Sequence, residues 1–239
     1  MFCRLYIEDE ITTGSSIKLA SEQGHYLRSV MRFTPGNPVV LFNGLGGEYQ
    51  ATIETLTKND SSLYVESFTD ISREMPIRIH IIQAACRSEK IDTVLQKATE
   101  LGAASFSIVR SERSSLKLDG ARLKKRLERW QKIVIEAAEQ SERTALPRVQ
   151  WINKLCDITT RGLAFTLHTD TPSCWPQQRN NIIHSTDITL AVGPEGGWSR
   201  NDIETLSAAG FKSLTFGPRI MRTETAAPAI LAAIQSLLD

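Results

Sequence analysis

The chain has 239 residues, of which 41% are hydrophobic and 23% are charged. This mixture excludes a collagen, a disulfide-dominated peptide and a disordered tail, and the length allows one large domain or two unequal ones. Lys and Arg number 28 against 27 Asp and Glu, and the resulting net charge of +1 at first argues against a nucleic-acid partner.

Residues 1–72 have the pattern of a small all-β domain. Turn residues separate four β-rich runs: RLYI, PVVLF, YQATIETL and SLYVESF. The pair Asn43-Gly44, followed by Gly46 and Gly47, predicts a hairpin loop between the second and third runs. Apolar residues recur at near-helical spacing in SEQGHYLRSVMRF, which predicts one short helix. We therefore expect a small β-barrel with one helix.

From residue 73 onward the pattern changes to alternating strands and amphipathic helices. The strand-like runs are IRIHIIQAA, FSIVR, LAFTLHTD, ITLAVG and SLTFG. Between and after them lie helical patterns: SEKIDTVLQKATELG, a long helix capped by Asp119, RNDIETLSAAG and APAILAAIQSLL. Alternation of this kind is typical of an α/β domain with a mostly parallel sheet. The predicted domains are residues 1–72 and 73–239.

The charge is distributed unevenly between the two predicted domains. Residues 1–72 carry 5 basic and 9 acidic side chains, whereas residues 73–239 carry 23 and 18. Residues 110–132 alone hold nine basic side chains and three acidic ones. A basic surface on the second domain is thus masked in the total by acids elsewhere, and a nucleic-acid partner is again possible.

The long predicted helix carries two stripes of different character. Its apolar stripe, expected to be buried, consists of Leu123, Leu127, Trp130, Val134 and Ala137. Its basic stripe consists of Arg122, Lys125, Arg129 and Lys132. The basic stripe has two interpretations with about equal support: a face that follows nucleic-acid phosphates, or a solvated helix face.

Two glycine-containing loops follow strand-like runs and lead into helices. The first is GPEGGWS at 193–199, where Ser199 and Asp202 form a predicted capping box. The second is GPRIMRTET at 217–225. Ligands bind at the carboxyl ends of strands in open α/β sheets, so the pair of loops predicts a binding site, although a single GPEGG could be only a tight turn. Neither loop has a dinucleotide or P-loop pattern.

Other chemical signatures are weak. The four cysteines have no zinc or disulfide spacing, and the four histidines are scattered, with His168 more often structural than catalytic in such a position. No apolar run approaches the ~18 residues of a membrane helix, and no secretory leader precedes the first acids. We expect a cytoplasmic protein without a metal or a membrane partner.

Several motifs, in order along nearly the whole chain, resemble one known family. They are HYLRSVMRF, GGEY, LQKATELGA, ERSS, ERWQKIVIEAAEQSER, AVGPEGGWS and FGPRIMRTETA. They are similar to those of the RsmE family, the 16S ribosomal RNA uracil N(3)-methyltransferases of the SPOUT superfamily. Arg87 stands where the family commonly has lysine, and Met221 replaces a leucine, changes that preserve charge or bulk.

The resemblance implies both a fold and a function. It implies an N-terminal PUA-like β-barrel and a C-terminal α/β methyltransferase domain with a trefoil knot, in a homodimer. It also implies transfer of a methyl group from S-adenosylmethionine (SAM) to N(3) of a uridine in the 16S ribosomal RNA, within the small ribosomal subunit. An RNA-binding protein without activity and a ribose 2′-O-methyltransferase of the same superfamily are the alternatives.

Site residues follow from the same resemblance. Three loops are expected to form the SAM pocket, through Leu167, His168, Thr169, Gly193, Pro194, Glu195, Gly196, Gly197, Phe216, Gly217, Ile220, Met221 and Thr223. Arg222 is expected to stabilise the negative charge that develops when uracil N(3) loses its proton. Glu224 is expected to orient Arg222; a general base and an acid that complements a helix dipole are the alternatives.

RNA contacts are predicted from the positions of basic side chains in both domains. The candidates are Arg4, His25, Arg28, Arg32, Arg87, Lys90, Arg110, Arg113 and Arg143. Two further groups share helix faces: Gln96, Lys97 and Glu100, and Gln140 with Arg143. These two faces fit site residues and a dimer contact equally well.

Overall fold

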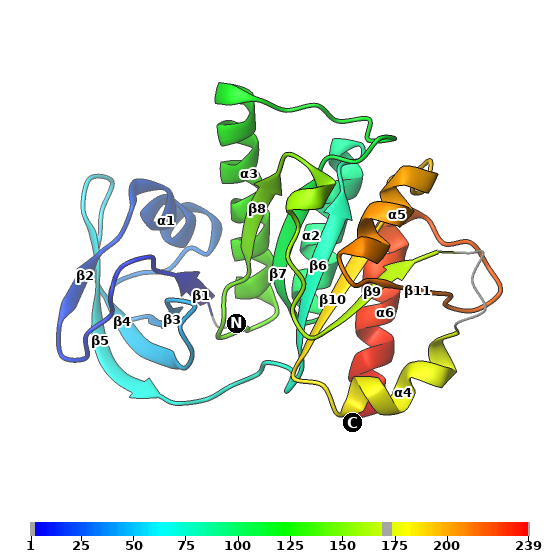
Figure 1. The fold of residues 1–239 in the computed structure, drawn as a ribbon. Helices are drawn as coiled ribbons and strands as arrows, with labels where there is room; N and C mark the ends of the chain where they lie inside the picture. The colour runs from blue at the N-terminus through cyan, green and yellow to red at the C-terminus, as the bar shows by residue number, and fades with distance from the viewer. Residues whose placement is uncertain (1–2, 169–173, 239) are drawn as a thin grey trace. The chain divides into compact units, whose positions relative to one another are not determined.

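The computed structural model describes residues 3–168 and 174–238, and the chain divides into two compact units (Figure 1). The N-terminal unit comprises Met1–Glu74 together with Ala138–Leu146. The C-terminal unit comprises Met75–Ala137 and Pro147–Asp239. The segment 138–146 was not expected in the first unit, because sequence patterns follow the chain and do not show which distant segments pack together.

The N-terminal unit is built on one mixed five-stranded sheet with the strand order β1-β3-β4-β5-β2. Its elements are β1 (Cys3–Tyr6), β2 (Ser16–Lys18), α1 (Ser21–His25), the π-helical turn η1 (Tyr26–Val30), β3 (Pro38–Phe42), β4 (Glu48–Leu56) and β5 (Ser61–Thr69). The four predicted strands and the short helix are confirmed, while β2 is too short for a detectable pattern. Leu27 of η1 is fully buried in a core with Leu41, Ile53 and Leu63.

The predicted hairpin loop joins β3 to β4, which pair antiparallel. The Asn43 side-chain oxygen accepts a hydrogen bond from the Leu45 amide at 3.2 Å, as in an Asx-turn. Gly47 has φ +69°, and a Cβ there would lie 2.3 Å from the ring of Phe68. Glycine is therefore required at this position by both backbone conformation and space.

A network of ion pairs ties the 138–146 segment to the sheet of the N-terminal unit. Arg4 lies 2.6 Å from Glu48, donates to the backbone oxygen of Arg143 at 2.8 Å, and stacks over Phe42. The Arg143 guanidinium pairs with Glu74. Burial alone would raise the pKa of Glu48, but hydrogen bonds from Arg73 and Arg4 hold that pKa below its usual value.

Arg4 and Arg143, both predicted as RNA contacts, are paired inside the N-terminal unit. Their side chains are only 7% and 5% exposed, and both guanidinium groups are occupied by carboxylates of the same unit. A buried, paired arginine exposes no charge for a phosphate, and breaking the pair would leave a buried carboxylate uncompensated. In this structure both residues stabilise the unit.

The C-terminal unit contains a six-stranded sheet in the order β11-β9-β10-β6-β7-β8, with every neighbouring pair parallel. Its strands are β6 (Arg78–Ala84), β7 (Ala103–Val109), β8 (Arg148–Ile152), β9 (Leu163–Leu167), β10 (Asp187–Val192) and β11 (Lys212–Leu214). The predicted α/β class and parallel sheet are confirmed. All carboxyl ends of these strands consequently lie at one edge of the sheet.

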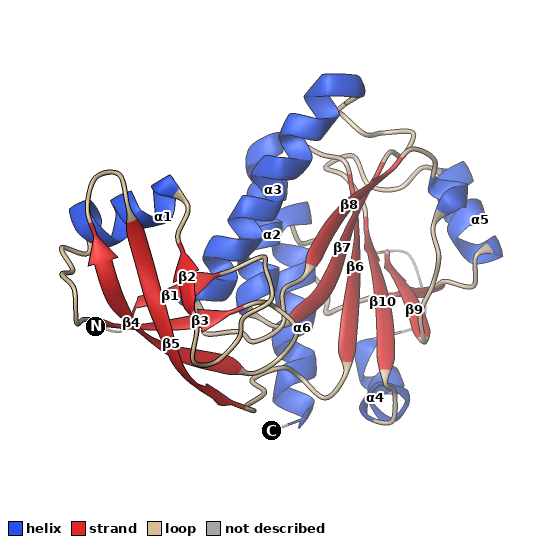
Figure 2. Ribbon diagram, turned by 90° about the vertical axis from the view of Figure 1, so that its left-hand side faces the viewer, coloured by secondary structure: helices blue, strands red, loops and turns tan. Residues whose placement is uncertain are grey.

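Helices cover both faces of this sheet. They are α2 (Ser88–Glu100), α3 (Gly120–Gln140), the 3-10 turn η2 (Leu155–Asp157), α4 (Trp175–Ile183), α5 (Arg200–Ala208) and α6 (Thr223–Leu238). Figure 2 shows α2, α3 and α6 on one face and α5 on the other. Among the described residues, no helix is both long and apolar enough to cross a membrane.

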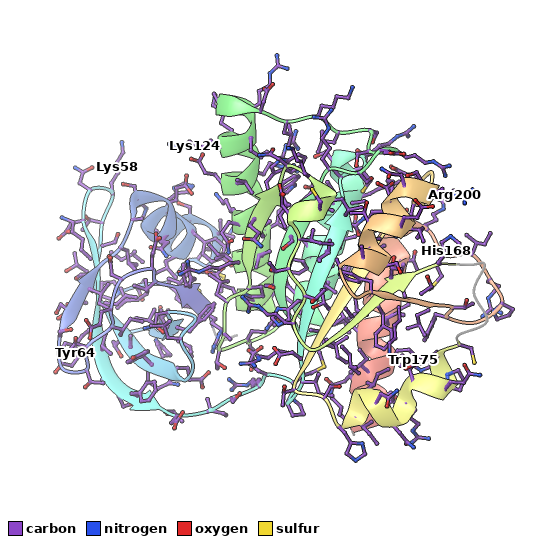
Figure 3. All side chains as sticks on the ribbon, in the orientation of Figure 1. Lys58, Tyr64, Lys124, His168, Trp175 and Arg200 are labelled. Atoms are coloured by element: carbon purple, nitrogen blue, oxygen red, sulfur yellow. The ribbon has the colours of Figure 1, made fainter. Side chains whose placement is uncertain are left out.

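Helix α3 has both of the stripes expected from its sequence. Trp130, Val134 and Ala137 are buried, whereas the apolar residues of its first turns are half-buried. The basic stripe is exposed, and so is Lys124 beside it (Figure 3). Arg129 of the basic stripe forms a two-bonded ion pair with Asp92 of α2, at 3.1 and 2.6 Å. At least this member of the stripe therefore has an intramolecular partner.

A polar cluster at the amino ends of β6 and β10 makes stability dependent on pH. Asp187 accepts two hydrogen bonds from Arg78, at 2.9 and 2.7 Å, and lies 3.1 Å from Nε2 of His80. Hydrogen bonds from Arg78 and His80 hold the pKa of Asp187 far below its ordinary value, and burial lowers the pKa of His80. Both shifts mean that the unfolded chain binds more protons than the folded one.

We expect the free energy of unfolding to fall in acid as a consequence of this cluster. The His80 contribution is complete above about pH 6.5 and declines below it, and that of Asp187 declines below about pH 4. Asp187→Asn is expected to cost about 1–2 kcal/mol at pH 7 and to flatten the profile below pH 4. Urea unfolding from pH 3 to pH 8 measures both effects, and an unchanged acid slope in the variant would contradict this assignment.

Candidate functional site

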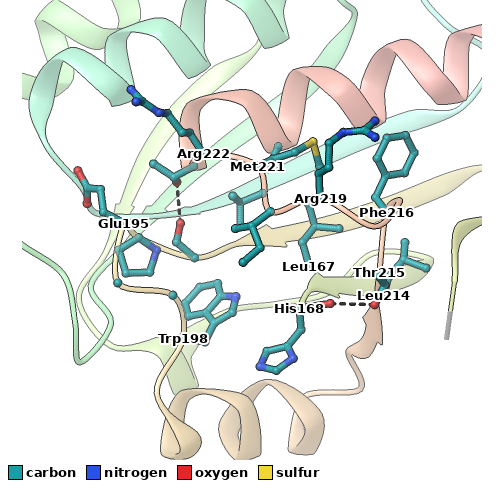
Figure 4. Close-up of a pocket in the computed structure, with 18 of the residues that line it drawn as sticks. Leu167, His168, Glu195, Trp198, Leu214, Thr215, Phe216, Arg219, Met221 and Arg222 are labelled. Carbon is teal, nitrogen blue, oxygen red and sulfur yellow. Dashed lines mark hydrogen bonds between the residues drawn. The ribbon is translucent and has the colours of Figure 1, made fainter. Parts of the chain in front are cut away.

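A cavity of about 700 Å³ lies where β9, β10 and β11 end (Figure 4). The lining residues that the sequence had indicated are Leu167, His168, Gly193, Pro194, Glu195, Gly196, Gly197, Phe216, Gly217, Ile220, Met221 and Thr223. Thr169, predicted with them, lies outside the described residues. The structure thus brings the three predicted loops together around one cavity. Its volume falls in the range of ordinary small-molecule sites, about 300–1,000 Å³.

The first loop, residues 193–197, is a tight turn that leads into α5. The Gly197 amide donates to the oxygen of Pro194 at 2.9 Å, and Gly197 has φ +67°. The predicted capping box is confirmed: Ser199 and Asp202 exchange two hydrogen bonds of 3.0 Å. Since α5 begins with a satisfied N-terminus, the loop is anchored at its carboxyl end.

Residues of the C-terminal unit that the sequence did not assign to the cavity also form its walls. Arg113, predicted as an RNA contact, donates from Nη1 to the oxygen of Gly196 at 2.8 Å. The Trp198 ring lines the cavity, and its Nε1 has no hydrogen-bond partner within the described part of the chain. A buried indole donor without a partner is a group that a ligand acceptor would satisfy.

The first and second loops are joined by a buried hydrogen-bond network. Thr223, the first residue of α6, donates from Oγ1 to the oxygen of Gly193 at 2.6 Å. Gln83, near the end of β6 and fully buried, donates from Nε2 to the same Oγ1 at 2.9 Å. Sequence reasoning missed Gln83, although a lone glutamine in the strand-like run IRIHIIQAA was a visible signal of a buried polar contact.

The third loop of the cavity begins with Leu167 and His168 at the end of β9; the backbone of β11 holds it, and an aromatic contact fixes the neighbouring Phe216. The His168 amide donates to Leu214 at 3.1 Å, and Thr215 Oγ1 donates to the oxygen of His168 at 3.1 Å (Figure 4). Phe216 meets the ring of Trp175 edge-on, with ring centroids 5.3 Å apart. His168 thus contributes backbone contacts, in line with the structural interpretation.

Arg222 lies at the rim of the cavity, and Glu224 follows it in the first turn of α6. The Arg222 side chain is 82% exposed, whereas that of Glu224 is 19% exposed. Nη1 of Arg222 is 4.0 Å from Oε1 of Glu224, a distance at which charges attract but no hydrogen bond forms. The hydrogen bond expected between these two side chains is therefore not formed in this structure, and the cation nearer to Glu224 is Lys90, 3.4 Å from its Oε2.

The remaining predicted RNA residues lie outside the cavity. His25 and Arg32 are exposed on the N-terminal unit, and the half-buried Arg28 donates to the oxygen of Thr57. Arg87 and Arg110 are exposed on the C-terminal unit. On the two helix faces that fit either site residues or a dimer contact, Lys97 pairs with Glu100 at 2.8 Å, and Gln96 and Gln140 are exposed.

No cluster of three or more metal-ligating side chains occurs among residues 3–168 and 174–238. The site instead consists of glycine backbone, apolar walls and a rim of opposite charges.

The fold and site, a parallel sheet with two glycine loops at its carboxyl edge and a separate β-unit, are those of an RNA methyltransferase. A family model described as an RNA methyltransferase domain matches residues 73–235, and one described as an RNA methyltransferase PUA domain matches residues 19–63.

Comparison with individual proteins narrows this class. The chain is 32% identical to the ribosomal RNA small subunit methyltransferase E of Synechocystis, over 100% of this chain and 79% of the relative. A Neisseria gonorrhoeae enzyme of the same name, crystallised with SAM, superposes with a TM-score of 0.90 at 32% identity, covering 99% of this chain and 98% of that one. A Legionella pneumophila methyltransferase in complex with SAM superposes with a TM-score of 0.91 at 33% identity, with the same coverage of both chains. The chain belongs to the ribosomal RNA small subunit methyltransferase E family.

Proposed function

We propose that this protein transfers the methyl group of SAM to N(3) of one uridine in 16S ribosomal RNA. The observation that carries the proposal is the single cavity formed by all three loops that the family resemblance indicated, with Arg222 exposed at its rim. Two relatives of the same fold, each about one third identical to this chain, were crystallised with SAM. We propose the pocket residues of the three loops as the SAM site, and Arg222 as the catalytic residue.

The cavity has the properties that SAM requires. Leu167, Ile220 and Met221 supply apolar walls, and the glycines of the first loop let the ligand approach the backbone closely. Trp198, which lines the cavity, has an indole Nε1 without a hydrogen-bond partner among the described residues. When bound, SAM supplies an activated methyl group on its sulfonium sulfur.

The chain's own residues then have to position the base and stabilise its charge. Uracil N(3) carries a proton, and its loss spreads negative charge over N(3), O2 and O4. The Arg222 guanidinium is a cation that offers several hydrogen-bond donors, so it is suited to this developing charge. Holding N(3) in line with the methyl group lowers the rest of the activation barrier to methyl transfer.

We propose further that the two units divide the work. The N-terminal unit, with exposed His25 and Arg32, contributes RNA contacts, and the C-terminal unit adds Arg87, Arg110 and the basic stripe of α3. The substrate is 16S ribosomal RNA within the small ribosomal subunit, and the enzyme acts as a cytoplasmic homodimer without a metal. The Gln96 and Gln140 helix faces are the surfaces to test for a dimer contact.

The proposal is tested by cofactor binding and by the RNA product. Isothermal titration calorimetry of purified protein with SAM is expected to give heat of binding. Nucleoside mass spectrometry of 16S ribosomal RNA from a deletion strain is expected to show loss of 3-methyluridine, restored by the gene. Unchanged 3-methyluridine would refute the assignment. Loss of a ribose-methylated nucleoside instead would favour a 2′-O-methyltransferase, and binding of RNA without SAM would favour an RNA-binding protein that lacks activity.

A further inference from the structure

Lys90 occupies a position between the two glycine loops. It lies in the first turn of α2, lines the cavity, and its side chain is 21% exposed. Its Nζ is 3.6 Å from Oε1 of Glu195 on the first loop and 3.4 Å from Oε2 of Glu224 at the start of α6. One ammonium group therefore contacts a carboxylate from each loop.

Glu195 is held in addition by the amino end of α2. The amide of Arg87, the N-cap residue of that helix, donates to Oε1 of Glu195 at 3.2 Å. Burial would raise the pKa of Glu195, but hydrogen bonds from its own backbone amide and from that of Arg87, together with the charges of Lys90 and Arg87, bring that pKa below its usual value. The positive end of the helix dipole favours the same anion. Glu195 is thus ionised and fixed to α2.

Glu224 depends more strongly on Lys90. Its Oε2 is buried, makes no hydrogen bond within the described residues, and has the Lys90 ammonium as its close charge partner. The only other cation paired with this carboxylate in the described structure is Arg222, at 4.0 Å and 82% exposed. Without Lys90 a largely buried carboxylate would face a second carboxylate across the cavity wall, an arrangement that costs free energy.

We infer that Lys90 is a positioning residue: its ammonium joins Glu195 to Glu224 and thereby holds the two glycine loops at the spacing that SAM binding requires. This inference rests on the proposed function, because it takes SAM as the ligand. The contacts of Lys90 with the two carboxylates do not depend on that function. The positioning role replaces the RNA contact predicted for Lys90, because an ammonium already shared by two carboxylates offers little net charge to a phosphate.

The test compares Lys90→Met, Lys90→Arg and the double variant Lys90→Met/Glu224→Gln. Lys90→Met keeps the length of the stem and removes the charge, and we expect about tenfold weaker SAM binding by calorimetry, a loss of about 1.4 kcal/mol. Lys90→Arg is expected to restore most of the affinity. The double variant is expected to bind SAM more tightly than Lys90→Met alone, because it removes the repulsion between the carboxylates. A role confined to packing of the stem predicts no such rescue.

A control variant and a second measurement separate the possible outcomes. Arg200→Met removes an exposed cation, 94% exposed and paired with Glu204 on α5, and is expected to bind SAM like the wild type. Hydrogen exchange of residues 193–197 and 223–226 without SAM is expected to be faster in Lys90→Met. If the wild type fails to bind SAM, the proposed function fails, and the exchange data still test the bridge. Wild-type affinity and exchange in Lys90→Met would overturn the inference.

Discussion

Replacing Arg222 by alanine is expected to leave SAM affinity within about twofold of wild type and to slow methyl transfer by about a hundredfold or more. The reason lies in the position of the side chain: it is 82% exposed at the cavity rim, so it contributes little to the walls that hold a cofactor. Its cation is nevertheless free to meet a base that approaches from solvent. The loss should therefore appear in the rate of the chemical step.

Single-turnover methylation of small subunits that lack the modification measures this rate, and calorimetry measures SAM binding. Arg219→Ala is the matched control, since it removes the same charge from the same loop of the cavity. We expect that control to cost less than about tenfold, because Arg219 has no assigned contact with the reacting base. Methylation by Arg222→Ala near the wild-type rate would show that another group stabilises the charge.

Local sequence patterns were sufficient to predict most of the fold. Alternating apolar residues predicted β4 and β5, and the Asn43-Gly44 pair predicted the hairpin loop before β4. Ser199 and Asp202 predicted the start of α5. Each of these features is determined by residues within a few positions of one another. The elements that were missed carry weak local signals: α4 has no continuous apolar stripe, and β8 is a short, half-exposed edge strand.

The ion pairs that the sequence did not indicate join residues far apart in the chain. Arg4 and Glu48 are separated by 44 positions, and Arg143 and Glu74 by 69. A basic residue has the same appearance in a sequence whether it faces solvent or a buried carboxylate, so the carboxylate partners of Arg4 and Arg143 could not be predicted. The two carboxylates near Lys90, Glu195 and Glu224, were not predicted for the same reason. The two glycine loops were predicted as neighbours because the carboxyl ends of parallel strands lie at one edge of the sheet, whereas the loop after β9 was added by the family resemblance.

Gln83→Leu is expected to weaken SAM binding by about thirtyfold while the protein remains folded. The Nε2 group of Gln83 donates to Oγ1 of Thr223 at 2.9 Å and also approaches the oxygens of Ala84 and Gly193. Leucine fills a similar volume but leaves these buried acceptors short of a donor, which costs about 1–3 kcal/mol. Because Gly193 and Thr223 belong to different loops, the same change loosens the spacing of both walls of the cavity.

The matched control is Thr166→Val on β9, in the same sheet. Thr166 is also buried, but its Oγ1 makes no hydrogen bond within residues 3–168 and 174–238, so an isosteric valine leaves no partner unsatisfied. Thermal unfolding monitors folding, and calorimetry monitors SAM affinity, for both variants. Equal affinity in Gln83→Leu and Thr166→Val would mean that the network does not set the spacing of the loops. A loss confined to Gln83→Leu would place the control of cofactor affinity in the buried end of β6, beneath the loops that form the cavity.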